Sequence, residues 1–296
     1  MQAPDFLAKH AQSVEKSCLD TLNQRRDVVP ARLFDAMLYS LLAGGKRVRP
    51  ALLLSCFKAC GGTDEQLAMP AAVSIEAMHT YSLIHDDLPC MDNDDLRRGK
   101  ATCHKQFDEE TAVLAADALQ ALSFELLTDI HTDADTRLTM IKDMGIAAGC
   151  QGMVGGQMMD ILAENTQIDN VLEVERIHLH KTGELLRWSC EAGARLAGAK
   201  PQDFAACSRY GKAVGLLFQI ADDILDTTAS SEALGKSAGK DEAQNKATYV
   251  SVLGVQKARE LADEMCELAL QACDSLNGEA GKELRELALY ILKRGQ

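Results

Sequence analysis

Five aspartates and two arginines lie close together in the stretch SLIHDDLPCMDNDDLRRG, residues 82–99. The members that matter most are Asp86, Asp87, Asp92, Arg97 and Arg98. Clustered carboxylates suit Mg²⁺, which takes one or two of them and completes its shell with water and phosphate oxygens. An EF-hand calcium loop does not fit, because its required glycine, counted from Asp92, falls on Arg97. A solvated acidic surface is the alternative for any single pair of this kind.

A second acidic cluster lies in QIADDILD and contains Asp222, Asp223 and Asp226. In a helix, side chains three and four residues apart share a face, so Asp222, Asp226 and Gln219 lie together. Asp223 points about 100° around the helix from Asp222. Carboxylates in an otherwise apolar helix are costly to bury, and the helix dipole disfavours them near its C-terminal end. A positive partner is therefore expected, and two such clusters make a solvated surface a poor explanation.

Basic side chains that suit an anion occur in GGKRVRP, which places Lys46, Arg47 and Arg49 between two glycines and Pro50. A flexible turn, cationic side chains and a helix N-terminus together are typical of an anion site. A solvated basic loop is an equally good interpretation of this stretch alone.

Further candidates are scattered along the chain. HKTGE, within what reads as a long helix, supplies Lys181 and Thr182, and Lys236 follows the second acidic cluster. His79 precedes Asp86 by seven residues, which is two helical turns, and so shares its face. A lone histidine there is more often a packed residue than a ligand. One diphosphate on Mg²⁺ and a second on arginine and lysine would use all of these parts.

The elements that must position these residues are helices. Only six prolines occur, none of them between Pro89 and Pro201, and this long interval is rich in helix formers. Aromatic residues are 4% of the chain, and no β-branched run alternates cleanly. We expect one all-α domain over residues 1–296, with about ten helices.

Several helix boundaries are predicted. Pro50, Pro70 and Pro201 are each expected at the first helical position of a helix, and Asp169 and Asn170 are expected to cap a fourth helix. Pro89 disfavours a straight helix after Asp87, so the chain should bulge and return Asp92 towards Asp86. The stretch 227–246 is rich in Gly, Ser and Lys, and a mobile loop is expected there.

Composition excludes several classes of function. A net charge of −13 makes the chain a poor general ligand for nucleic acid or an anionic membrane, so an anionic ligand must be held locally. No apolar run of membrane-spanning length and no signal peptide are recognised, so stable membrane insertion is not expected. The ten cysteines form no CxxC pair and no zinc spacing. Free thiols in a reducing cytoplasm are the simplest interpretation.

The chain resembles the bacterial short-chain trans-isoprenyl diphosphate synthases, most closely those that make farnesyl diphosphate. The resemblance runs through GGKRVRP, EAMHTYSLIHDDLPCMDNDDLRRGKATCH, GGQMMD, HKTG, LLFQIADDILD and LGKSAGKDEAQNKATY, and so covers nearly the whole chain. It implies an all-α bundle with the two aspartate motifs facing each other across a central cavity. It also implies a homodimer.

The resemblance assigns roles to the candidate residues. Up to three Mg²⁺ ions, or Mn²⁺ in their place, would bind an allylic diphosphate to Asp86, Asp87, Asp92, Asp222, Asp223 and Asp226. The same diphosphate would contact Arg97, Lys181 and Lys236, beside Thr182 and Gln219. The diphosphate of isopentenyl diphosphate would bind to Lys46, Arg49, His79 and Arg98.

The implied reaction is head-to-tail prenyl transfer. Dimethylallyl or geranyl diphosphate ionises, isopentenyl diphosphate attacks the allylic cation, and the departing diphosphate takes the proton. A bulky residue at Tyr81, beside the small Ser82, is associated in the family with the fifteen-carbon product, although a core role for Tyr81 remains open. Farnesyl diphosphate is the expected product.

Three other interpretations remain. Geranylgeranyl diphosphate synthases share the first motif, so a twenty-carbon product is the main alternative. Terpene cyclases use a similar bundle, but DDILD disagrees with their second metal motif. A regulatory subunit with a decayed site would lack metal ligands or cations, and none is missing here.

Overall fold

The computed structural model describes residues 3–164, 166, 168–228, 248–276 and 278–294. This part of the chain contains twelve α-helices of eight or more residues and confirms the all-α fold. Their bounds are α1 (Asp5–Asn23), α2 (Ala31–Leu41), α3 (Val48–Ala59), α4 (Glu65–Asp86), α6 (Glu109–Thr128), α7 (Ala134–Ala148), α8 (Met153–Ala163), α9 (Val171–His178), α10 (Glu184–Leu196), α11 (Pro201–Thr228), α15 (Val255–Ala272) and α16 (Gly278–Arg294).

Shorter elements connect the long helices. They are the hairpin strands β1 (Leu96–Arg97) and β2 (Lys100–Ala101), the helices α5 (Cys103–Gln106) and α14 (Tyr249–Leu253), a π-helical segment (Leu179–Gly183) and a 3₁₀ turn (Cys273–Ser275). The expected loop 227–246 lies outside the described residues, apart from the two threonines that end α11.

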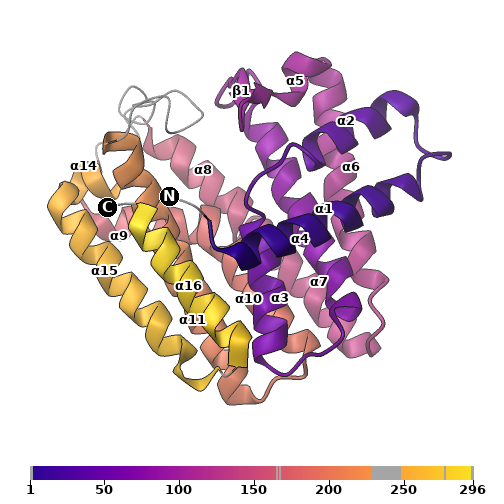
Figure 1. The fold of residues 1–296 in the computed structure, drawn as a ribbon. Coiled ribbons are helices and arrows are strands. Elements are labelled where there is room, and N and C mark those ends of the chain that lie inside the picture. Colours follow the sequence, from indigo (N-terminus) through magenta and orange to yellow (C-terminus); the bar gives the residue numbers. More distant parts are fainter. Residues whose placement is uncertain (1–2, 165, 167, 229–247, 277, 295–296) are drawn as a thin grey trace.

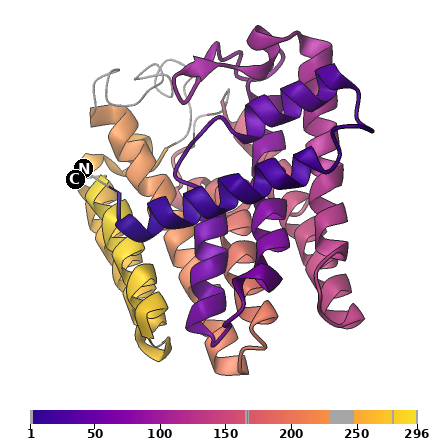
Figure 2. The same cartoon turned by 45° about the vertical axis from the view of Figure 1, so that its right-hand side comes forward.

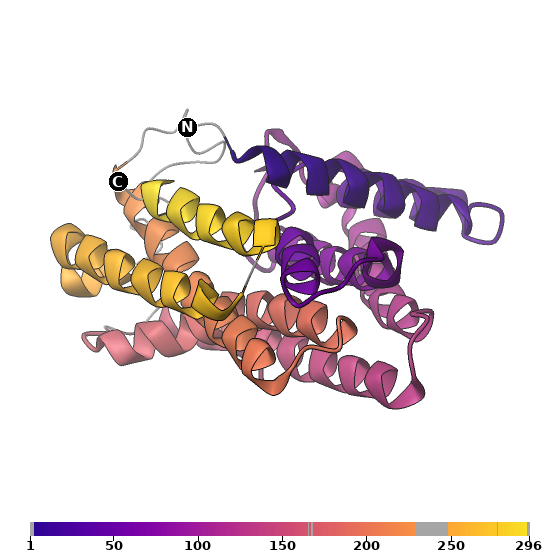
Figure 3. The same cartoon turned by 60° about the horizontal axis from the view of Figure 1, so that its bottom comes forward.

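The long helices run roughly side by side, and α1 crosses them (Figures 1 and 2). Helices α15 and α16 lie beside α11 at one edge of the bundle, and α6 and α7 lie at the opposite edge (Figure 3). Helices α3, α4, α10 and α11 pack between these edges. The apolar core consists of two clusters, one around α4 and α6 and the other around α11, α15 and α16.

Two of the predicted helix starts are confirmed and two are wrong. Helix α11 begins at Pro201, and the Asn170 side chain caps α9. Helix α3, however, begins at Val48, so Pro50 is its third residue, where no intrahelical hydrogen bond is lost. Helix α4 begins at Glu65, and Pro70 lies inside it. Its true N-cap is Asp64, whose side chain accepts a hydrogen bond from the backbone of Gln66.

Helix α6 is long and apolar enough to cross a membrane, by length and composition alone. The sequence pattern had indicated no such segment. In the fold, α6 packs against α2 and α4 and buries nine of its side chains, which is also how a core helix behaves.

Candidate active site

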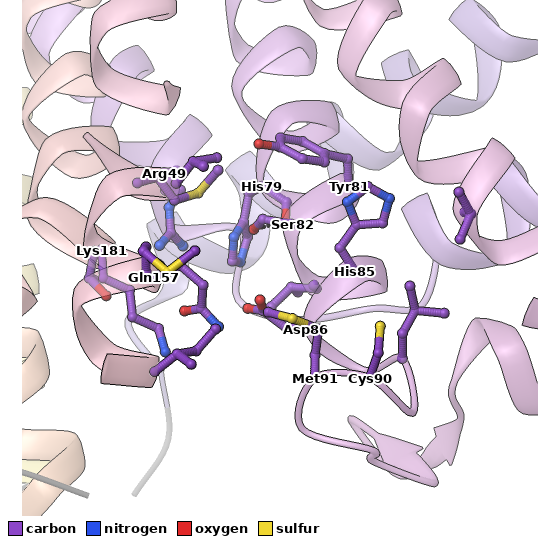
Figure 4. Close-up of a pocket in the computed structure, with 18 residues that line it drawn as sticks. Arg49, His79, Tyr81, Ser82, His85, Asp86, Cys90, Met91, Gln157 and Lys181 are labelled. Carbon is purple, nitrogen blue, oxygen red and sulfur yellow. Dashed lines mark hydrogen bonds between the residues drawn. The ribbon is translucent and has the colours of Figure 1, made fainter. Parts of the chain in front are cut away.

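A cavity of about 510 Å³ lies among helices α3, α4 and α8 and the π-helical segment. Its wall combines the predicted polar residues with apolar side chains from α4, α6 and α8. The predicted residues that reach it are Arg49, His79, Tyr81, Ser82, Asp86, Lys181 and Thr182. Figure 4 shows Asp86 on one side of this space and Arg49 and Lys181 on the other. Residues from three separate sequence motifs therefore meet around one apolar cavity.

The chain turns back on itself directly after Asp86. Helix α4 ends there, and the backbone N–H of Asp92 donates to the carbonyl of Asp86 at 2.8 Å. The predicted bulge is thus confirmed. Burial raises the pKa of the Asp86 carboxyl to about 6, Lys181 opposes this rise, and the Asp92 carboxylate adds to it. Repelling carboxylates of this kind favour a bound cation.

Asp87 differs from its neighbour Asp86. It is only 3% exposed and is absent from the cavity wall. Arg97 Nε donates to its Oδ1 at 2.7 Å, and the same guanidinium lies 3.4 Å from the Asp94 carboxylate. Burial raises the pKa of Asp87, and the hydrogen bond from Arg97 limits that rise. Arg97 therefore has carboxylate partners already before any phosphate arrives.

The second aspartate cluster receives its positive partner from the C-terminal helix. Arg294 Nη2 lies 3.0 Å from Asp222 Oδ1, and its guanidinium packs over the ring of Phe218. Asp226 is 7% exposed, and its Oδ1 has no hydrogen-bond partner among the described residues. The sequence pattern predicted a positive partner for this cluster but did not identify Arg294. Nothing in the C-terminal residues KRGQ indicates that this arginine lies against α11.

Asp222 connects the second cluster to the cavity electrostatically. Its carboxylate is close enough to favour the charged form of Arg49, which lines the cavity. The three second-cluster aspartates do not themselves line that cavity. Arg49 thus links Asp222 electrostatically to the cavity wall.

The π-helical segment interrupts what reads in the sequence as one long helix. It joins α9 to α10 and carries Lys181 and Thr182. Lys181 Nζ pairs with Asp160 Oδ2, and Thr182 Oγ1 donates to Gln219 Oε1 at 2.8 Å. Helix α8 comes so close that a Cβ on Gly156 would meet the Lys181 backbone nitrogen at 2.2 Å. Asp160 was not singled out in the sequence, although it ends the GGQMMD stretch.

Arg49 and His79 line the same cavity, and at neutral pH Arg49 is charged whereas His79 is neutral. Burial lowers the pKa of Arg49 to about 10, so it stays charged at neutral pH. Burial and the nearby Arg49 and Arg98 hold the pKa of His79 well below its usual value. His79 is therefore a neutral donor or acceptor.

The loop before α3 does not present three free cations. Arg47 adopts a left-handed backbone conformation and is 2% exposed, with Glu76 and Glu15 as ion-pair partners. It is thus a structural residue. Lys46 is exposed and lies 5.2 Å from the centre of the Tyr290 ring.

Arg98 lies across this same loop. Its guanidinium donates to the carbonyl of Gly44 and covers Gly45, where a Cβ would approach within 2.6 Å. Lys236, the remaining predicted cation, lies outside the described residues.

Tyr81 is both a core residue and a residue of the cavity wall. It is 4% exposed, belongs to the core, and also lines the cavity. Its ring meets His85 edge-on. Ser82 beside it donates to the backbone carbonyl of His79 at 2.9 Å.

The donor set fits Mg²⁺ bound together with phosphate. Among the residues the structure describes, no three His, Cys, Asp or Glu side chains stand close enough to hold a metal by themselves. Mg²⁺ needs only one or two carboxylates when substrate phosphate supplies other ligands. The raised pKa of Asp86 and the unpartnered Asp226 oxygen both favour such a cation.

Comparison with known proteins agrees with this arrangement. The polyprenyl synthetase family model matches residues 30–290. The chain is 42% identical to a chloroplastic geranylgeranyl pyrophosphate synthase of Catharanthus roseus, covering 98% of this chain and 80% of that protein. It is also 42% identical to a farnesyl diphosphate synthase of Micrococcus luteus, covering 90% of each.

A solved structure has the same fold. It is the geranyltransferase of Helicobacter pylori in complex with magnesium and isoprenyl diphosphate, which superposes with a TM-score of 0.78. Sequence identity is 34%, and the match covers 99% of this chain and 97% of that one. The family model spans most of the chain and the relatives exceed 40% identity, so the chain belongs to the polyprenyl synthetase family and is a prenyltransferase of the trans-prenyl diphosphate synthase type.

Proposed function

We propose that this chain transfers the prenyl group of dimethylallyl or geranyl diphosphate to isopentenyl diphosphate and makes farnesyl diphosphate as its main product. The observation that carries the proposal is the meeting of Asp86, Lys181 and Arg49 on one largely apolar cavity. Carboxylates and cations suit a metal-bound diphosphate, and the apolar wall suits an isoprenoid tail.

Asp86, Asp92, Asp222 and Asp226 are the residues that would hold Mg²⁺ with the allylic diphosphate. The bound metal would stabilise the charge that grows on the leaving diphosphate, which is typically worth several kcal/mol. The H. pylori geranyltransferase, whose structure is a complex with magnesium and isoprenyl diphosphate, supports this choice of metal.

Lys181 is placed to share in that stabilisation. Its ammonium lies at the cavity wall beside Asp160, and Arg97 lies behind Asp87 at the end of the same acidic turn. Charge developing on the diphosphate strengthens its attraction to both cations, so these contacts favour the transition state over the ground state.

Arg49 and neutral His79 would bind the second diphosphate, with Arg98 and Lys46 at the rim. Binding there brings the double bond of isopentenyl diphosphate towards the allylic carbon. No residue is needed as a dedicated base, since the departing diphosphate accepts the proton. The apolar side chains of α4 and α8 keep water away from the allylic cation.

The fifteen-carbon product rests on Tyr81, whose bulky ring lines the cavity more than one helical turn before Asp86 on α4. A twenty-carbon product is the second candidate. The named relatives support both, since they include synthases of each product.

We also propose a cytoplasmic homodimer. Val113, Leu114, Val154 and Met158 are exposed apolar side chains on α6 and α8, and three of the four border the cavity. A second copy of the chain over this surface would cover them and close the cavity wall.

Chromatographic product analysis tests the proposed function. The enzyme is incubated with dimethylallyl and isopentenyl diphosphates and Mg²⁺, and the chain length of the product is read after dephosphorylation. A fifteen-carbon alcohol is expected, and excess EDTA should abolish its formation. A twenty-carbon product would favour the alternative, and full activity in EDTA would rule out the metal-dependent reaction.

A further inference from the structure

Asp222 and Asp223 are adjacent but occupy different environments. Asp222 is partly exposed and pairs with Arg294, whereas Asp223 is 4% exposed. The helical rotation of about 100° between neighbours turns Asp223 towards α9 and α14.

Asp223 is tied to the start of α14 and lies close to α9. Its Oδ2 accepts the backbone N–H of Tyr249 at 2.8 Å, whereas His178 Nε2 lies 3.7 Å from the same oxygen, beyond hydrogen-bond distance. The imidazole of His178 stacks on the Tyr249 ring with centroids 5.3 Å apart. Tyr249 and His178 are both buried. Burial lowers the pKa of His178 to about 4, so its ring is neutral at physiological pH.

These contacts join three pieces of the proposed active site. Asp223 follows Asp222 in α11, and Tyr249 begins α14. His178 ends α9 and directly precedes the π-helical segment that carries Lys181. The carboxylate holds the start of α14, and the Tyr249 ring there stacks on His178, so Asp223 braces the residue that directly precedes the π-helical segment.

We propose that Asp223 is a positioning residue that braces α11 against α9 and α14, and that its carboxylate is not a metal ligand. This inference rests on the proposed function and reassigns one residue that the family resemblance groups with the metal ligands. Asp223 acts through the hydrogen bond that it accepts and not through its negative charge. Asp222 beside it acts through its charge.

Asparagine substitutions separate these two roles. An asparagine keeps a carbonyl oxygen that can accept the Tyr249 N–H but carries no charge. Asp223→Asn should therefore lose less than about tenfold in kcat, whereas Asp222→Asn should lose at least about 100-fold, since metal-mediated stabilisation is worth several kcal/mol. Asp223→Ala removes the acceptor and should lose more than Asp223→Asn, because small misplacements of a catalytic group are costly.

Two measurements do not depend on turnover. Hydrogen exchange read by mass spectrometry should show faster exchange at the start of α14 in Asp223→Ala and near wild-type exchange in Asp223→Asn. Calorimetric titration of Mn²⁺ in the presence of inorganic diphosphate should give wild-type stoichiometry for Asp223→Asn and a reduced one for Asp222→Asn.

The outcomes are distinguishable. If Asp223→Asn loses as much activity and metal binding as Asp222→Asn, Asp223 is a ligand and the proposal is overturned. If Asp223→Ala lowers only the melting temperature and leaves kcat intact, the brace is merely structural and the proposal is also overturned. Failure of the wild-type enzyme to form any prenyl product would instead contradict the proposed function.

Discussion

The Thr182 hydroxyl donates to Oε1 of Gln219 at 2.8 Å, and this bond ties the π-helical segment directly to α11. Thr182 is buried, and Gln219 lies one turn before Asp222. Lys181 is the neighbour of Thr182 and lines the cavity. The bond therefore sets the distance between a cation for the diphosphate and a cluster of carboxylates for its metal.

Thr182→Val should remove this bond at nearly constant volume. The partly buried Gln219 oxygen then loses its partner, and the net loss of such a hydrogen bond costs about 0.5–1.5 kcal/mol. We expect a fall in kcat of about tenfold or more, because Lys181 is no longer held in place. Thr182→Ser keeps the hydroxyl and is the matched control. Steady-state kinetics in which both variants behave alike would show that the bond has no role.

Asp86→Asn should stabilise the metal-free protein while it abolishes activity. The folded pKa of Asp86 is about 6, above the ordinary aspartate value of 3.8, so the folded state binds the proton more tightly than the unfolded state. The contribution of Asp86 to the free energy of unfolding therefore decreases as the pH rises from about 4 to about 6. Asparagine removes this penalty, which amounts to on the order of 1–2 kcal/mol after allowance for partial exposure.

Thermal unfolding in EDTA at two pH values measures this effect. The gain in melting temperature should be present at pH 8 and absent near pH 4. Asp20→Asn is the control, because Asp20 is an exposed residue of α1. A destabilised Asp86→Asn protein at pH 8 would mean that the carboxylate is favourably solvated in the free enzyme.

Cys90 should be the thiol whose modification inhibits the enzyme. Cys90 and Cys150 are exposed, but only Cys90 lines the cavity. Buried thiols such as Cys18, whose pKa is raised to about 12 by burial, should react slowly. N-Ethylmaleimide should thus inhibit the wild type and the Cys150→Ser variant but not Cys90→Ser. Equal inhibition of both variants, with labelling mapped by mass spectrometry, would place the sensitive thiol elsewhere.

The sequence predicted the type of fold and several of the residues that line the cavity, because those features depend on local pattern. Pro89 and the spacing of Asp86 and Asp92 were enough to predict a bulge, since proline acts on its own turn. The burial and ion pairing of Arg47 were not predictable, because its partners Glu15 and Glu76 come from two helices distant in the sequence.

The role of Arg294 as the partner of Asp222 was not predicted for the same reason. Its contact with Asp222 joins residues 72 positions apart. The close packing of α8 on the π-helical segment was not predictable either, because it brings Gly156 against the backbone of Lys181, 25 residues later in the chain. Local sequence patterns thus predict which helix or loop carries a candidate residue. Tertiary packing decides which residues of a motif face the cavity.

Tyr81→Ala should lengthen the product. The ring lines the cavity at some distance along α4 from Asp86, so its removal opens space where the growing tail extends away from its diphosphate. Because Tyr81 is also 4% exposed, the same change should cost about 3 kcal/mol or more of stability. Chromatography of the products and a melting curve should therefore show longer prenyl chains from a less stable enzyme.

The control for this prediction is Tyr210→Leu. Tyr210 is fully buried in the other core cluster, and its hydroxyl donates to the Leu284 carbonyl at 2.7 Å, away from the cavity wall. Its substitution should lower stability without changing product length. If Tyr81→Ala folds and still gives only the wild-type product, Tyr81 is a core residue and the limit on chain length must come from elsewhere on the wall. The apolar α8 residues Val154 and Met158, which line the same cavity, would then be the next to test, because a tail that passes Tyr81 must run along them.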